Sequence, residues 1–104
     1  MSTVYIAGPM SGLPDFNYPA FRAAEGELRR AGHEPLNPAD AEALNDTGVP
    51  QAWAWYMRHA LGMVIRAEGI ALLPGWERSR GATLEHLVAL QLGMDIRPIE
   101  GWLA

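Results

Sequence analysis

Cysteine is absent from the 104-residue chain, which excludes disulfides, thiolate metal sites and cysteine nucleophiles. No apolar run approaches the roughly 18 residues of a membrane span, so we expect none. The first residues lack a basic region followed by an apolar stretch, so we expect no signal peptide and a cytoplasmic protein. We expect no metal site either, because His33, His59 and His86 lack ligand spacing.

Positive charge is also scarce, with 8 Lys and Arg against 12 Asp and Glu and a net charge of −4. This balance argues against binding long nucleic acid by charge neutralisation. One or two phosphates remain compatible with it, since backbone amides at a helix start can hold them. Hydrophobic residues make up 49% and charged residues 19%, which is typical of a globular protein, and the length predicts a single domain over residues 1–104.

Apolar periodicity predicts strands that alternate with helices along the chain. We expect strands over residues 3–7, 33–36, 70–73 and 95–99, and helices from about 19 to 31, 51 to 67 and 81 to 93. Asp40 is expected to cap a short helical turn over residues 41–44. This alternation is typical of an α/β protein with a parallel sheet.

Two glycine-containing loops follow predicted strands, over residues 8–12 and 74–81. In parallel sheets, ligands bind beyond the carboxyl ends of the strands. These loops are therefore the first indication of where a functional site lies.

Ser79 and Gly81 stand at the predicted start of a helix, an arrangement that can cradle a phosphate. The alternative is that Ser79 is only an N-cap. Trp76, in the same loop, could stack on a nucleobase or simply cover the edge of the sheet.

Glu85 is the most specific candidate, because helical spacing places it on the stripe of Val88 and Leu92. A carboxylate among apolar neighbours resists ionisation or needs a partner, and it can act as a nucleophile at a sugar carbon. The alternative is an exposed glutamate that pairs with a neighbour. Tyr5, inside the first strand, is either a core residue or a site hydroxyl.

Three segments together resemble the nucleoside 2-deoxyribosyltransferase-like superfamily, and in particular its short, mostly unassigned members from phages and bacteria. They are Tyr5-Ile6-Ala7-Gly8-Pro9-Met10-Ser11-Gly12, Leu73-Pro74-Gly75-Trp76-Glu77-x-Ser79-x-Gly81-Ala82-x-x-Glu85 and Ala89-x-x-Leu92-Gly93. The resemblance implies a flavodoxin-like fold with helices on both faces of the sheet. It also implies cleavage or exchange of the N-glycosidic bond of nucleosides or nucleotides, without metal or organic cofactor.

The resemblance also implies residue roles. Glu85 falls at the family's nucleophile and Tyr5 at the tyrosine that positions it. Ser79 and Gly81 match the pair that holds phosphate in 5′-monophosphate N-glycosidases, which favours a nucleotide over a nucleoside. Four residues of the first loop are assigned to substrate binding: Gly8, Met10, Ser11 and Gly12. Of these, Ser11 and Gly12 correspond loosely to the family's phosphate contacts.

The chain departs from that family at one position. Relatives usually carry an aspartate on the helix before the central strand, whereas this chain has Ala60 there, and residues 51–67 contain no acid. Either His59 substitutes, or a different group serves, or efficient catalysis has been lost. The last case leaves a non-catalytic nucleotide-binding or sensing module as the alternative function.

Tryptophans indicate assembly, since Trp53, Trp55 and Trp102 exceed what so small a domain easily buries. We expect a homodimer or higher homo-oligomer with the helix over residues 53–64 at the contact. A neighbouring subunit could then supply the acid that is missing near Ala60.

Overall fold

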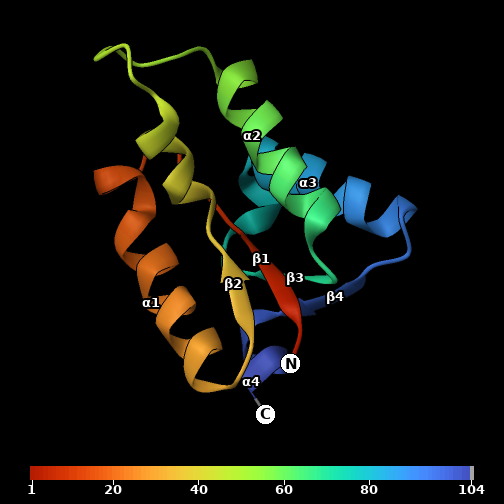
Figure 1. Cartoon of the computed structure of the whole chain (residues 1–104). Coiled ribbons are helices and arrows are strands. Elements are labelled where there is room, and N and C mark those ends of the chain that lie inside the picture. The colour runs from red at the N-terminus through yellow and green to blue at the C-terminus, as the bar shows by residue number, and fades with distance from the viewer. Residues whose placement is uncertain (104) are drawn as a thin grey trace.

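The computed structural model describes residues 1–103 and is built on one parallel sheet of four strands in the order β2-β1-β3-β4 (Figure 1). Its strands are β1 (Thr3–Ala7), β2 (Glu34–Leu36), β3 (Gly69–Leu72) and β4 (Asp95–Pro98). Every neighbouring pair runs parallel, so the predicted α/β class with a flavodoxin-like parallel sheet is confirmed. Strand order reverses between β1 and β3, the place where such sheets bind ligands.

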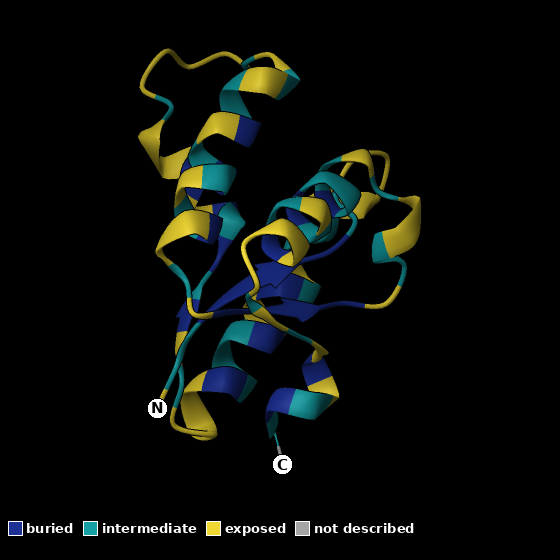
Figure 2. Cartoon of the chain, turned by 90° about the vertical axis from the view of Figure 1, so that its right-hand side faces the viewer, coloured by how far each residue is buried: buried dark blue, intermediate teal, exposed yellow. Residues whose placement is uncertain are grey.

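Helices cover both faces of the sheet, as expected. Helices α1 (Tyr18–Arg30) and α4 (Ile99–Leu103) pack on one face, and α2 (Trp53–Arg66) and α3 (Arg80–Gln91) on the other. Three 3₁₀ segments join them: η1 (Pro14–Asn17), η2 (Pro38–Leu44) and η3 (Trp76–Arg78). Figure 2 shows the sheet as a buried layer between helices. Within residues 1–103, no helix has the length and apolarity to cross a membrane.

Side-chain alternation along β1 divides the core in two. Val4 and Ile6 join the cluster under α1 and α4, whereas Tyr5 and Ala7 join the cluster under α2 and α3. Tyr5 therefore lies on the same side of the sheet as Glu85.

The structure corrects two local predictions. The cap of the helical segment after β2 is Asn37, whose Oδ1 accepts from the Ala39 amide at 2.9 Å, and not Asp40. Asn37 is the cap because Pro38, whose backbone φ suits a first helical position, follows it directly. The helical segment therefore begins at residue 38, three residues earlier than expected. Ile99, predicted as the end of a strand, instead begins the short helix α4.

The structure also corrects the prediction that Trp102 lies at an exposed interface, because this residue belongs to the core. Its side chain is 4% exposed, and its Nε1 donates to the Ile70 carbonyl at 3.0 Å. Gly69 leaves room for the indole, since a Cβ at that position would lie 2.5 Å from the ring. The short helix α4 thus brings the tryptophan back onto the sheet.

Candidate active site

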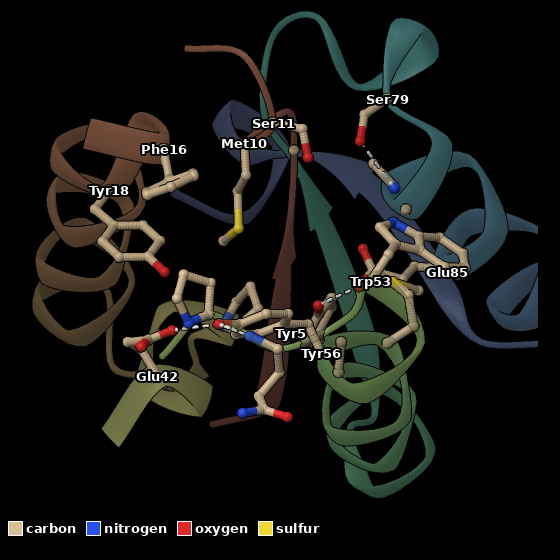
Figure 3. Close-up of a pocket in the computed structure, with 18 residues that line it drawn as sticks. Tyr5, Met10, Ser11, Phe16, Tyr18, Glu42, Trp53, Tyr56, Ser79 and Glu85 are labelled. Atoms are coloured by element: carbon tan, nitrogen blue, oxygen red, sulfur yellow. Dashed lines mark hydrogen bonds between the residues drawn. The ribbon is translucent and has the colours of Figure 1, made fainter. Parts of the chain in front are cut away.

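A cavity of about 540 Å³ opens at the carboxyl edge of the sheet, a size ordinary for a small-molecule site. Its walls come from the loop after β1, the segment η2 after β2, and the first turns of α2 and α3. Figure 3 shows the side chains that line it. The cavity therefore lies at the edge of the sheet where the two glycine-containing loops predicted a site.

Glu85 and Tyr5 meet in this cavity, and the Tyr5 hydroxyl donates a hydrogen bond to Glu85 Oε2 (Figure 3). Glu85 lies in the second turn of α3 and is 5% exposed. Its fully buried companions on α3 are Ala82 and Ala89. Val88 is partly buried against the same cluster, as the spacing predicted, whereas Leu92 is 58% exposed. The buried face of α3 carries small residues on either side of Glu85, and the carboxylate reaches Tyr5 of β1 from it.

Burial controls the ionisation of this pair. Removal from water raises the pKa of Glu85 from 4.5 to about 8, and the hydrogen bond from Tyr5 acts in the opposite direction. Desolvation also raises the pKa of Tyr5 well above 10, with further contributions from the charge and hydrogen bond of Glu85. The phenol therefore stays protonated and acts only as a donor when Glu85 is ionised.

The start of α3 forms a polar corner of the cavity. Ser79 is its N-cap, and Ser79 Oγ accepts from the Ala82 amide at 3.1 Å, which leaves the hydroxyl hydrogen free to donate. Among the described residues, the amides of Arg80 and Gly81 have no hydrogen-bond acceptor. The capping role and the phosphate-binding role of Ser79 are therefore compatible in one geometry.

Arg80 lies beside this corner, with its guanidinium carbon 3.7 Å from the centre of the Trp53 ring. Trp53 lines the cavity and Gly81 packs against the same helix, where a Cβ would lie 3.2 Å from Met57 Sδ. Glycine at this position therefore allows α2 and α3 to pack closely where both line the cavity.

In the first loop, the structure brings Gly8, Met10 and Ser11 to the cavity but not Gly12. Gly8 also has a packing role, because a Cβ there would lie 2.8 Å from Leu73 Cβ. Gly12 has a φ of 80°, and a Cβ added to it would meet nothing within 4 Å, so it serves the turn of the loop.

Trp76 also lies outside this cavity. Its ring stacks on His86, with centroids 4.5 Å apart, and it lines a separate, smaller pocket beside Leu72 and Pro98. Of the two interpretations of Trp76, the geometry matches the one in which it covers the edge of the sheet.

Ala60 lines the cavity where the family resemblance places an aspartate, whereas His59 does not line it. The His59 ring packs against Trp55 with centroids 4.3 Å apart. Sequence reasoning missed a carboxylate on another wall, that of Glu42 in η2, which accepts from the Tyr56 hydroxyl at 2.8 Å. One feature of the sequence could have indicated Glu42: it follows the strand predicted over residues 33–36, and the carboxyl end of that strand lies at the same edge of the sheet as the cavity.

Two aromatic residues, one in η1 and one at the start of α1, were missed as well. Phe16 and Tyr18 line the cavity with ring centroids 5.8 Å apart. Phe16 has a φ of 53°, in the left-handed region, and lies between two other residues with positive φ. The Asn17 side chain holds this turn by donating to the Pro9 carbonyl at 2.9 Å. Such backbone strain is found more often beside functional sites than elsewhere.

A parallel sheet with a ligand-sized cavity at its carboxyl edge, and a buried carboxylate facing it, defines an α/β protein with one candidate small-molecule site. Residues 2–97 match the family model described as "Domain of unknown function (DUF4406)", and the chain belongs to that family. A comparison with curated proteins finds no match.

Proposed function

We propose that the protein cleaves or exchanges the N-glycosidic bond of nucleoside 5′-monophosphates, as a cytoplasmic enzyme that resembles the nucleoside 2-deoxyribosyltransferase-like superfamily. The observation that carries this proposal is the buried pair of Tyr5 and Glu85 at the wall of the cavity, with Glu85 on the helix α3 whose start forms the polar corner. Both groups belong to rigid elements, so the reacting centre and the anchor keep a fixed spacing.

In the proposed reaction, Glu85 Oε attacks the anomeric carbon as the bond from that carbon to the base nitrogen breaks. The bonding electron pair leaves with the base, which takes up a proton from solvent. Water, or the ring nitrogen of a second base, then attacks the anomeric carbon of the resulting glycosyl ester and gives up a proton to solvent, while the bond from that carbon to Glu85 breaks and its electron pair regenerates the carboxylate. Tyr5 positions the carboxylate and stabilises its ionised form through its hydrogen bond.

Phosphate is proposed to bind at the start of α3. Three donors support this assignment: the Ser79 hydroxyl and the amides of Arg80 and Gly81. Ser11 from the first loop also lines the cavity and offers a fourth donor (Figure 3). The positive end of the helix dipole favours an anion at the same place.

A non-catalytic nucleotide-binding or sensing module is the second candidate. The observation that favours it is the apolar surface of α2 near Glu85, where Met57 and Ala60 stand and no acid is present in residues 51–67. A buried carboxylate with a pKa of about 8 is also mostly protonated at pH 7.

One experiment separates the two candidates. The protein is incubated with a panel of nucleoside 5′-monophosphates and the matching nucleosides, in ribose and deoxyribose form, and free base is measured by chromatography. We expect base release from the monophosphates, and none from the Glu85→Gln variant, whose nucleotide affinity stays within a few-fold. Thermal shifts without base release would select the binding module, and unchanged turnover in the Gln variant would overturn the role of Glu85.

We also propose that the chain forms a homodimer or higher homo-oligomer, with the predicted contact helix α2 and its neighbour α3 at the contact. Large apolar side chains remain exposed on the second layer of helices, among them Ile65 of α2 and Leu87 and Leu90 of α3, each at least half exposed. A symmetric contact would remove these side chains from water.

A further inference from the structure

The cavity contains a second carboxylate, on the opposite side from Glu85. Glu42 and Glu85 are its two acidic side chains, and within the described lining no Lys or Arg accompanies them. Figure 3 places Glu42 on one side of the cavity with Tyr18 and Phe16, and places Ser79 and Glu85 on the other. The cavity thus has two chemically different ends.

Glu42 is held in position by its neighbours. Tyr56 donates its hydroxyl hydrogen to Glu42 Oε2 at 2.8 Å, and Asn45 Nδ2 lies 3.3 Å from Oε1. The backbone N–H of Gln51 in turn donates to the Tyr56 hydroxyl at 3.4 Å. Because a carboxylate oxygen accepts more than one hydrogen bond, each oxygen of Glu42 keeps acceptor capacity toward a ligand.

An aromatic wall stands beside this carboxylate. Phe16 is 59% exposed although it lines the cavity, and its ring lies at 41° to that of Tyr18. Exposed aromatic faces next to a cavity suit the stacking of a planar ring. The combination of flat apolar faces and an acceptor-only group is suited to a nucleobase that presents N–H donors.

This inference rests on the proposed function, which places the phosphate at the start of α3 and the anomeric carbon at Glu85. The base then extends toward the remaining end of the cavity, where its edge meets Glu42. Among the common bases, only guanine presents two adjacent N–H donors, from N1 and the 2-amino group. Adenine and cytosine place a ring acceptor beside the amino group, and uracil places its N–H between two carbonyls.

We propose that Glu42 selects the base and that the preferred substrates are guanine nucleoside 5′-monophosphates. The two carboxylate oxygens accept from N1–H and the 2-amino group, and the ring acceptor of adenine or cytosine meets a repulsive oxygen. Tyr56 is a positioning residue that fixes the Glu42 carboxylate for this contact. Specificity here combines attraction for one base with repulsion of the others.

The test compares guanosine and inosine 5′-monophosphates, which differ only in the 2-amino group. Base release and calorimetric affinity are measured for each, with affinity determined in the Glu85→Gln background. We expect a preference for guanine of about tenfold over hypoxanthine, and a larger one over adenine. Glu42→Gln reduces the guanine-to-hypoxanthine ratio to near one, and Tyr56→Phe reduces it in part.

Glu34→Gln is the matched control, since Glu34 is an exposed glutamate of β2 outside the cavity, and it keeps the full ratio. Base release from nucleotides without a guanine preference, or a ratio unchanged in both the Glu42 and Tyr56 variants, overturns this inference and leaves the proposed function standing. Failure of every nucleotide to bind overturns both, so the two failures are distinguishable.

Discussion

Tyr5 and Glu85, 80 positions apart in the chain, are joined by a hydrogen bond from the phenol to the carboxylate inside a buried layer between the sheet and α3. Its formation requires β1 and α3 to be correctly packed. Buried polar groups need a hydrogen-bond partner because water cannot reach them. Here the phenol donates and the carboxylate accepts, so each group satisfies the other.

Tyr5→Phe removes the hydrogen bond that favours the ionised form of Glu85. The pKa of Glu85 then rises above its value of about 8, so base release at pH 7 should fall by about tenfold or more. A pH–rate profile checks this, since the midpoint of its rising limb should move upward and activity should recover in part near pH 9. A lowered rate with an unmoved midpoint would contradict the role of Tyr5 in ionisation.

The folding stability should also depend on the ionisation of Glu85. Its folded pKa of about 8 lies above the ordinary 4.5, so the unfolded chain loses this proton first as the pH rises. The contribution of this group is therefore most favourable below about pH 4.5 and is lost progressively up to about pH 8, by a few kcal/mol. Glu85→Gln, which cannot ionise, should gain stability relative to the wild type across that window.

Urea unfolding at pH 5 and pH 8.5 measures this difference. Glu34→Gln serves as the control and should follow the wild-type dependence on pH. Parallel stability curves for the wild type and the Glu85 variant would show that Glu85 ionises as readily in the fold as in the unfolded chain.

Ser79→Ala should weaken nucleoside 5′-monophosphates much more than the matching nucleosides, because only the former use the start of α3. The loss of a charge-assisted hydrogen bond corresponds to about 1.5–3 kcal/mol of binding free energy. Removal of the cap also lowers stability by about 1 kcal/mol. Calorimetry with both ligand types separates these effects.

Thr83→Ala is the control for Ser79. Its hydroxyl also belongs to the first turn of α3, but it donates to backbone carbonyls and does not line the cavity. Equal weakening of nucleotides and nucleosides by Ser79→Ala would leave that serine as a simple cap.

Gly8→Ala should destabilise the fold by more than about 2 kcal/mol, because the new Cβ would lie 2.8 Å from Leu73 Cβ and would push the ends of β1 and β3 apart. Gly12→Ala, with a φ of 80° and open space around the new Cβ, should cost only about 1 kcal/mol. Thermal unfolding of both variants gives the comparison. Equal costs would show that the sheet edge yields without strain.

Light scattering at micromolar concentration should return a multiple of the 11.4 kDa chain mass. Leu87→Glu, on the exposed face of α3, should shift the population toward the monomer if that face forms the contact. A wild-type mass of 11.4 kDa would defeat the oligomer, and with it any acid supplied by a neighbouring subunit near Ala60.

Local pattern in the sequence determined the order of elements and the edge of the sheet that carries the site. Short apolar runs predict buried strands, and apolar stripes with a 3.6-residue period predict helices with one buried face. When the two alternate along the chain, they predict a parallel sheet covered by helices. The same pattern placed Ser79 at a helix start and Glu85 on a buried stripe. These properties depend on neighbours within a few positions, so they can be read from the chain.

Tertiary structure alone decided which distant side chains meet. Three features depend on how the elements pack against one another. They are the hydrogen bond between Tyr5 and Glu85, the position of Glu42 of η2 in the cavity wall, and the packing of Trp102 of α4 in the core. Helical spacing predicted that Glu85 points inward and that Val88 lies beside the core, but it also predicted Leu92 there, which is exposed, and it did not predict the buried Ala82 and Ala89. Periodicity in the sequence predicts which face of a helix or strand is buried. Side-chain volume and the pairing of buried polar groups determine which residues on that face contact one another across the fold.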